Sequence, residues 1–335
     1  MRALVTGGSG FLGSALVRRL LADGHEVRSF ARHPASELAA LGADIRSGDI
    51  RDAAQVAEAV RGCDVVFHAA AKTGIWGRRS DFLRTNATGT VNVIAACFRH
   101  RVQKLIYTSS PSVVAHGGDL EGVDESTPYP DDYTSDYPET KARAERMVIA
   151  SNENVLPTVA LRPHLIWGPG DNHLVPRLLA RARAGRLRLV GDGRNRVDSV
   201  YIDNAVDAHL LAAEHLAAGS RVAGKVYFIS NAEPLAIADL INRILASGGL
   251  PPVSRSITFE RAFRLGKFCE RLYGFLRIRR EPLMTRFLAQ QLASAHWFDI
   301  GAAERDFGYR PRVSIAEGMQ RLAASLRPVP SGGSA

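Results

Sequence analysis

Residues 6–13 read Thr-Gly-Gly-Ser-Gly-Phe-Leu-Gly, and this loop joins a short apolar strand predicted over residues 2–6 to a helix predicted over residues 14–22. A second strand, predicted over residues 26–30, completes a βαβ unit of about 30 residues. Glycines here allow a tight turn, let the backbone approach a pyrophosphate, and leave the N–H groups of the helix facing the phosphates. The loop therefore predicts dinucleotide binding, with these contact residues: Gly7, Gly10, Phe11, Leu12 and Gly13.

Strands and helices continue to alternate beyond this unit. Further strands are expected over residues 43–47, 64–68, 104–108 and 157–161, with helices over 53–60, 86–100 and 137–151. Such alternation predicts the α/β class, with a doubly wound parallel sheet of the Rossmann type.

The pattern changes after residue 170, which predicts a division of the chain. We expect a Rossmann domain over residues 1–170 with a return segment at 197–230. A smaller, mostly helical substrate-binding subdomain is expected from residues 171–196 and 231–327. The Pro-, Gly- and Ser-rich residues 328–335 predict a disordered tail.

Composition narrows the class of protein. The 335 residues are 46% hydrophobic and 23% charged, as in an ordinary globular chain, and no apolar run reaches about 18 residues. The net charge of +9 comes without any nucleic-acid-binding motif, so we expect no nucleic-acid partner. Three widely spaced cysteines predict a reducing, cytoplasmic setting and no metal site.

The end of the second strand bears on the choice of dinucleotide. Sites that prefer NAD usually carry Asp or Glu there, bound to the ribose 2′-hydroxyl. This chain has no acid at residues 30–34 and carries Arg32 instead, which suits a 2′-phosphate. We therefore expect NADP (NADPH), the alternative being that Arg32 is a solvated loop charge.

Residues 137–141 read Tyr-Pro-Glu-Thr-Lys. In a helix, Tyr137 and Lys141 lie on one face, so the phenol and the ammonium can reach one site. A free Tyr titrates near ~10, and a neighbouring cation lowers that pKa by stabilising the phenolate. The pair therefore predicts proton transfer to or from a carbonyl or alcohol oxygen.

Taken together, these motifs resemble those of the extended short-chain dehydrogenase/reductase superfamily. The resemblance covers residues 1–170. Besides the glycine loop and the Tyr-Lys pair, it rests on the stretches 49–50, 64–71, 86–90, 107–110 and 162–169. It implies that Asp49 and Ile50 lie near the adenine, that Ala69 and Ala70 line the cofactor, and that Pro163 lies beside the nicotinamide.

The resemblance also implies catalytic roles. Tyr137 is expected to give its proton to the carbonyl oxygen, and Lys141 to bind the nicotinamide ribose and lower the Tyr pKa. Ser110 would polarise the carbonyl, although Ser112 lies on the same strand face and stays an alternative. Asn86 would hold a water or a backbone position, the alternative being a helix cap. His68 is expected to be a satisfied strand-end residue.

Within this superfamily the chain resembles the 3β-hydroxysteroid dehydrogenase branch, and most closely the bacterial 2-alkyl-3-oxoalkanoate reductases of long-chain olefin biosynthesis. Stretches at 71–77, 110–113, 161–177, 186–193 and 281–297 carry this resemblance. It implies NADPH-dependent reduction of a long-chain β-keto acid to the β-hydroxy acid, by a homodimer that assembles with other enzymes of the pathway.

Other functions remain open on these residues. A 3β-hydroxysteroid or sterol dehydrogenase shares every catalytic feature. A nucleotide-sugar epimerase has the same motifs but usually has the acid of an NAD site. A dehydratase usually has acidic residues where this chain has Ser109 and Ser110. A non-catalytic NADP-binding sensor often lacks the Tyr or the Lys.

The segment 261–280 carries an apolar stripe at helical spacing beside a run of basic residues. The stripe comprises Leu265, Phe268, Leu272, Phe275 and Leu276. It predicts an acyl tunnel or ordinary core. The basic face predicts either a solvated surface or peripheral contact with an anionic membrane.

Overall fold

A seven-stranded parallel sheet runs through the computed structural model of the chain, which describes residues 1–33, 35–153 and 155–327. Its strand order is β12-β7-β5-β4-β1-β2-β3, and every neighbouring pair is parallel. The predicted doubly wound sheet is thus confirmed. The strands are β1 (Arg2–Thr6), β2 (Glu26–Ala31), β3 (Asp44–Ser47), β4 (Val65–His68), β5 (Lys104–Thr108), β7 (Thr158–Pro163) and β12 (Lys225–Ile229).

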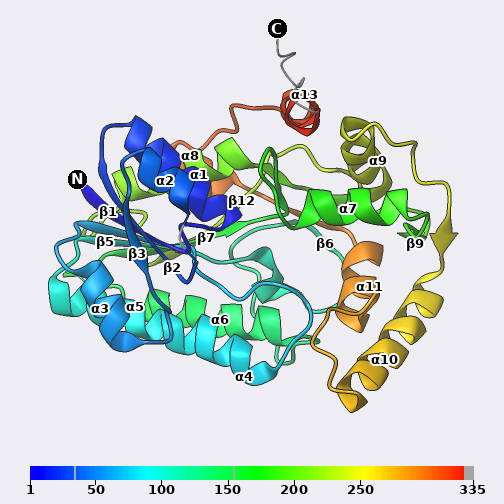
Figure 1. Ribbon diagram of the computed structural model, residues 1–335, viewed down its shortest axis with the longest axis horizontal. Helices are drawn as coiled ribbons and strands as arrows, with labels where there is room; N and C mark the ends of the chain where they lie inside the picture. Colours follow the sequence, from blue (N-terminus) through cyan, green and yellow to red (C-terminus); the bar gives the residue numbers. More distant parts are fainter. Residues whose placement is uncertain (34, 154, 328–335) are drawn as a thin grey trace, which may run out of the picture.

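Two helical layers cover the faces of this sheet (Figure 1). On one side lie α1 (Phe11–Ala22), α8 (Ile202–His215) and α12 (Gly301–Phe307); on the other lie α3 (Ala53–Val60), α5 (Gly89–His100) and α6 (Asp136–Ala150). Side chains of β1 alternate between the two cores, with Ala3 and Val5 in the first and Leu4 in the second. A sheet buried on both faces needs such uninterrupted apolar strands.

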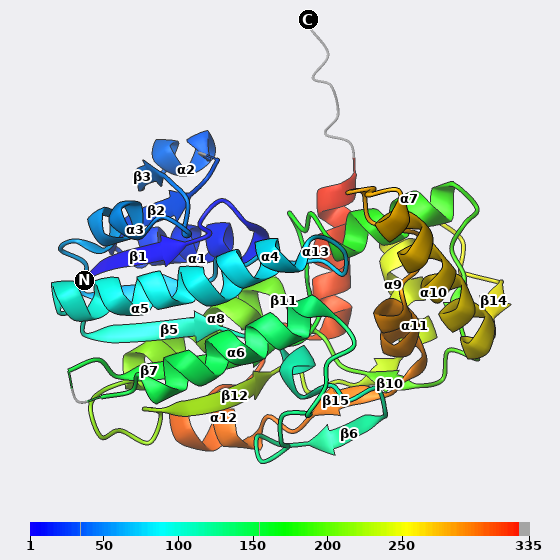
Figure 2. The same cartoon turned by 90° about the horizontal axis from the view of Figure 1, so that it is seen from below.

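Most of the remaining helices gather at one end of the molecule (Figure 2). They include α7 (Leu174–Arg183), α9 (Ile237–Ser247), α10 (Phe259–Phe275) and α11 (Arg286–Ala293), with α13 (Ile315–Leu326) packed on α9. Two short helices, α2 (Ser36–Ala40) and α4 (Arg79–Phe82), belong to the Rossmann part. Among the described residues, no helix has both the length and the apolar character needed to cross a bilayer.

Short strands link this end to the main sheet. A four-stranded sheet has the order β13 (Leu235–Ala236), β10 (Arg196–Val197), β15 (His296–Phe298) and β6 (Leu120–Val123). Two-stranded pairs join β8 (Ile166–Trp167) to β11 (Val200–Tyr201), and β9 (Leu189–Val190) to β14 (Ser256–Ile257). All of these strands except β6 have two or three residues, too few to leave a periodic signal, so the sequence did not predict them.

The predicted division into two subdomains stays a prediction. The main sheet does recruit α8 and β12 from the expected return segment 197–230. The tail expected to be disordered, residues 328–335, lies outside the described residues.

Candidate active site

The carboxyl ends of β1, β4, β5 and β7 meet at one edge of the sheet. Chain order reverses between β1 and β4, and ligands of open α/β sheets bind in the crevice at such a reversal. Seven predicted site residues lie at or just beyond these strand ends: Gly7, Gly10, Gly13, Ala69, Ala70, Ser110 and Pro163.

The glycine loop needs its glycines for close approach. Gly7 has φ +70°, and a Cβ there would lie 2.8 Å from the Cα of Ala70. A Cβ on Gly13 would lie 2.1 Å from the carbonyl oxygen of Gly7. With Gly10 at its N-cap, α1 opens on Phe11 without a capping side chain, so its first N–H groups can bind an anion. The loop and Ala69–Ala70 thus form a cradle that fits a dinucleotide pyrophosphate.

Arg32 and Asp49 follow β2 and β3, at the same edge of the sheet as the glycine loop. Arg32 follows β2 directly and is exposed, and its charge also acts on Asp49. The Asp49 carboxylate accepts hydrogen bonds from Arg51, at 3.0 Å to Oδ1 and 2.5 Å to Oδ2, which hold its pKa below the usual range. Ile50 is buried and would contact a Cβ at Gly89 at 2.9 Å, so it fixes this loop on α5.

Asn86 joins the backbone of Lys72 to α6, the helix that carries Tyr137 and Lys141. It is buried in a π-helical turn (Leu83–Thr88), and its amide donates to the carbonyl of Lys72 at 3.1 Å and accepts from the Lys72 N–H at 2.7 Å. The same Nδ2 donates to Oγ1 of Thr140 at 3.0 Å. The helix-cap alternative is wrong, because the side chain is used on Lys72 and Thr140 rather than on a helix end.

Lys141 is buried on α6, and its ammonium contacts a backbone carbonyl oxygen and an aromatic ring. Nζ donates to the carbonyl oxygen of Thr108 at 2.6 Å and lies 4.2 Å from the centre of the Tyr107 ring. Burial lowers the pKa of Lys141 to about 7, and the Glu145 carboxylate opposes this shift. Lys141 is therefore anchored to the carboxyl end of β5, with its remaining N–H groups free to bind a ligand.

Tyr137 lies one turn earlier, at the start of α6, and is partly buried. Burial raises the pKa of its phenol, and the neighbouring Ser110 hydroxyl lowers it. In this arrangement the Ser110 hydroxyl opposes the effect of burial on the Tyr137 pKa. The phenol therefore keeps its proton at neutral pH, as a proton donor must.

Ser110 and Ser112 share one hydrogen-bonded network. Their Oγ atoms lie 2.9 Å apart, and the Ser112 N–H donates to Ser110 Oγ at 3.3 Å. Ser110 thus caps the 3₁₀ turn Pro111–Val114 while its oxygen lies near Tyr137. This favours Ser110 over Ser112 as the hydroxyl beside the phenol.

His68 is held at the end of β4 as the sequence indicated. Nδ1 lies 2.8 Å from the Thr6 hydroxyl and Nε2 lies 3.0 Å from the Thr90 hydroxyl. Burial lowers the pKa of His68 to about 3, so the ring is neutral under ordinary conditions. Its role is to join β1, β4 and α5.

A buried ion pair joins β7 to α6. Arg162 on β7 donates to Glu145 on α6 through Nε at 2.9 Å and Nη2 at 2.7 Å. Tyr129 donates its hydroxyl to the same carboxylate at 2.6 Å. Both charged side chains are almost fully buried, so the pair locks α6 against the sheet.

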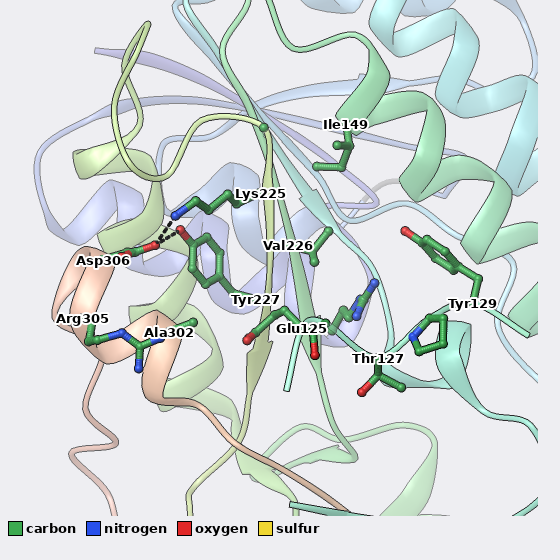
Figure 3. Close-up of a pocket in the computed structure, with 14 residues that line it drawn as sticks. Glu125, Thr127, Tyr129, Ile149, Lys225, Val226, Tyr227, Ala302, Arg305 and Asp306 are labelled. Carbon is green, nitrogen blue, oxygen red and sulfur yellow. Dashed lines mark hydrogen bonds and ion pairs between the residues drawn. The ribbon is translucent and has the colours of Figure 1, made fainter. Parts of the chain in front are cut away.

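Two hollows open near α6, and they differ in volume and in the residues that line them. One, of about 670 Å³, lies between α6, β12 and α12; it is lined by Tyr129, Lys225 and Arg305 among others, and by none of the predicted catalytic residues (Figure 3). The other, of about 210 Å³, is lined by Trp76, Asp136 and Glu139, at the turn of α6 that carries Tyr137. Neither hollow is lined by Tyr137, Ser110 or Lys141.

Several site residues escaped sequence reasoning. They are Lys72, Tyr107, Thr140, Glu145 and Arg162. Thr140 had a signal, because it stands inside the Tyr-x-x-x-Lys segment. The role of Lys72 lies in its backbone, which no side-chain pattern can indicate.

Comparisons with known proteins agree with this geometry. The family described as "3-beta hydroxysteroid dehydrogenase/isomerase family" matches residues 4–260. A 2-alkyl-3-oxoalkanoate reductase of Stenotrophomonas maltophilia is 53% identical, covering 97% of this chain and 99% of the relative. Another of that name, from Shewanella oneidensis, is 50% identical over 97% of this chain and 86% of the relative.

Among solved structures, a dTDP-glucose 4,6-dehydratase from Streptomyces venezuelae, crystallised as a double mutant with NAD, superposes with a TM-score of 0.75. It is 28% identical, and the match covers 97% of this chain and 96% of that one. The seven-stranded architecture is thus shared with this nucleotide-sugar enzyme, whereas the higher full-length identity lies with the keto-acid reductases.

Proposed function

This chain belongs to the 3-beta hydroxysteroid dehydrogenase/isomerase family and is an NAD(P)-dependent oxidoreductase, and from that premise we propose that it reduces a 2-alkyl-3-oxoalkanoic acid to the 2-alkyl-3-hydroxyalkanoic acid with NADPH. The observation that carries this proposal is the 53% identity, over almost the full length of both chains, to a protein named for that reaction. The site supports it, because the Tyr137 phenol lies beside the Ser110 hydroxyl, and Lys141 lies one turn later on the same helix.

Each site residue has a separate role in the proposed carbonyl reduction. When bound, the nicotinamide supplies a hydride to the carbonyl carbon. Tyr137 gives its proton to the carbonyl oxygen, and Ser110 holds that oxygen by a hydrogen bond. Lys141 binds the nicotinamide ribose from its anchor on Thr108, and Asn86 keeps the Lys72 backbone in register with α6.

The substrate class is tested by oxidation in the reverse direction. Purified protein with NADP should oxidise a long-chain 2-alkyl-3-hydroxyalkanoic acid with a kcat/KM at least ~10-fold above that for a 3β-hydroxysteroid, a difference of about 1.4 kcal/mol in transition-state binding. Absorbance of the reduced nicotinamide measures the rate. A higher value for the steroid would transfer the chain to the steroid and sterol dehydrogenases of its family.

Arg32 should set the choice of cofactor. A charge-assisted hydrogen bond to the 2′-phosphate is worth roughly 1.5–3 kcal/mol, so Arg32→Ala should lower kcat/KM for NADPH by roughly 10- to 100-fold and leave NADH almost unchanged. Arg61→Ala is the matched control, since Arg61 is exposed near the amino end of β4, at the opposite edge of the sheet. A wild-type preference for NADH, or equal losses with both cofactors, would contradict the assignment.

The proposed reaction also suggests a pathway, a compartment and partner proteins. We assign it to long-chain olefin biosynthesis in the cytoplasm, carried out by a homodimer in company with other enzymes of the pathway. The three cysteines support a reducing compartment, because all are buried free thiols.

A further inference from the structure

Helix α10 carries a row of apolar side chains that nothing in the described chain covers. Phe275 is 86% exposed, Phe268 62%, Leu265 41% and Leu272 39%. Their spacing of three and four residues places them on one side of the helix. The interpretation of this stripe as ordinary core is wrong, because core side chains are buried. The acyl tunnel stays a prediction.

A neighbouring side of α10 holds the helix in place. Ala262, Gly266 and Cys269 are buried there. The helix packs on α11, and a Cβ on Gly266 would lie 2.5 Å from the backbone carbon of Thr285. This close contact fixes the rotation of α10, so the apolar stripe stays exposed. The helix itself lies at the outer edge of the molecule (Figure 1).

Positive charge surrounds the stripe. Seven exposed basic residues lie on α10 or just after it: Arg261, Arg264, Lys267, Arg271, Arg277, Arg279 and Arg280. None of them takes part in an ion pair within the described part of the chain. The nearby carboxylates of Glu270 and Glu281 are already bound, by Arg286 at 2.6 Å and Arg177 at 2.9 Å.

We propose that α10 docks the protein on an anionic lipid surface, with Phe268 and Phe275 inserted among the acyl chains. Apolar side chains flanked by long basic ones are what an interfacial helix needs, since Lys and Arg reach the headgroups while Phe and Leu enter below them. A second copy of the chain is a poor occupant, because pairing the same face would bring two sets of seven cations together. This inference does not rest on the proposed reaction.

Vesicle flotation of the full chain tests the proposal. The protein should float with vesicles of phosphatidylcholine and phosphatidylglycerol at low salt, and should remain unbound with phosphatidylcholine alone or at high salt. Replacing Arg264, Lys267 and Arg271 with Gln should weaken partitioning at least ~10-fold, because each contributes to attraction at the surface. The double variant Phe268→Ser/Phe275→Ser should weaken it by a similar factor.

Matched control variants separate an effect of α10 from a general effect of losing surface charge or surface apolar groups. Arg61, Arg99 and Arg310 are exposed arginines away from α10 and should tolerate the same change to Gln, while Leu41→Ser/Val155→Ser removes exposed apolar groups from the Rossmann part. All four variants change surface residues, and reductase activity and circular dichroism should match the wild type. The proposal is overturned if anionic vesicles leave the protein unbound, if the α10 variants bind as the controls do, or if the phenylalanine variant breaks an oligomer in light scattering.

Discussion

Tyr137→Phe should lower kcat for carbonyl reduction by at least ~100-fold, while the Kd for the cofactor and the unfolding midpoint stay close to wild type. The substitution removes one oxygen and keeps the ring, so the packing at the start of α6 is preserved. What disappears is the proton donor, whose pKa is raised by burial so that the phenol is protonated at neutral pH. Turnover near the wild-type rate would remove Tyr137 from the mechanism.

The pH profile distinguishes loss of a proton donor from loss of structure. Reduction by the wild type should slow on the alkaline side, as the phenol loses its proton. Residual activity of Tyr137→Phe should lack the limb that belongs to the phenol and keep only the fall that accompanies loss of the proton of Lys141, whose pKa is about 7. Ser110→Ala serves as the companion variant. Because Ser110 lowers the Tyr137 pKa, its removal should move the limb to higher pH.

Glu145→Ala should lower the free energy of unfolding by about 3–5 kcal/mol, because it leaves the Arg162 guanidinium buried without its partner. Arg162 is 1% exposed and Glu145 is fully buried, so the remaining charge would have little solvation in place of the lost carboxylate. Such a loss is a large share of the ~5–15 kcal/mol that stabilises a typical domain. Chemical denaturation followed by circular dichroism measures it.

Two further variants sharpen this prediction. Glu139→Ala removes an acid from the same helix, but its partner Arg79 is mostly exposed, so the cost should stay below about 1 kcal/mol. Glu145→Leu combined with Arg162→Met should recover most of the stability, since an apolar pair of similar size avoids the unpaired charge. Equal effects of Glu145→Ala and Glu139→Ala would contradict a buried, structural ion pair.

Local patterns were enough to predict the sheet and the cofactor loop. The glycines at 7, 10 and 13 and the apolar runs that became β1, β4 and β5 depend on residues close in sequence. Contacts that join distant segments had no such signal. Asn86 binds the backbone of Lys72, and Glu145 meets Arg162, only because the sheet order brings these segments together.

The sequence also could not predict which side of α10 is exposed to solvent. Helical spacing in segment 261–280 placed Phe268 and Phe275 on one side of a helix, but spacing cannot say what lies opposite that side. The outcome depends on α11, which takes the small-residue face of α10 and leaves the phenylalanines outside.

The pairing of β6 with β15 has a consequence for synthesis of the chain. Leu120 pairs with His296, and β6 lies at the edge of its sheet with β15 as its neighbour. At roughly 5–20 residues per second, a ribosome takes on the order of ten seconds or more to deliver that partner after β6 has emerged. In that interval, the charge of Glu121 and the flexibility of Gly122 make the strand a poor template for aggregation with a neighbouring nascent chain.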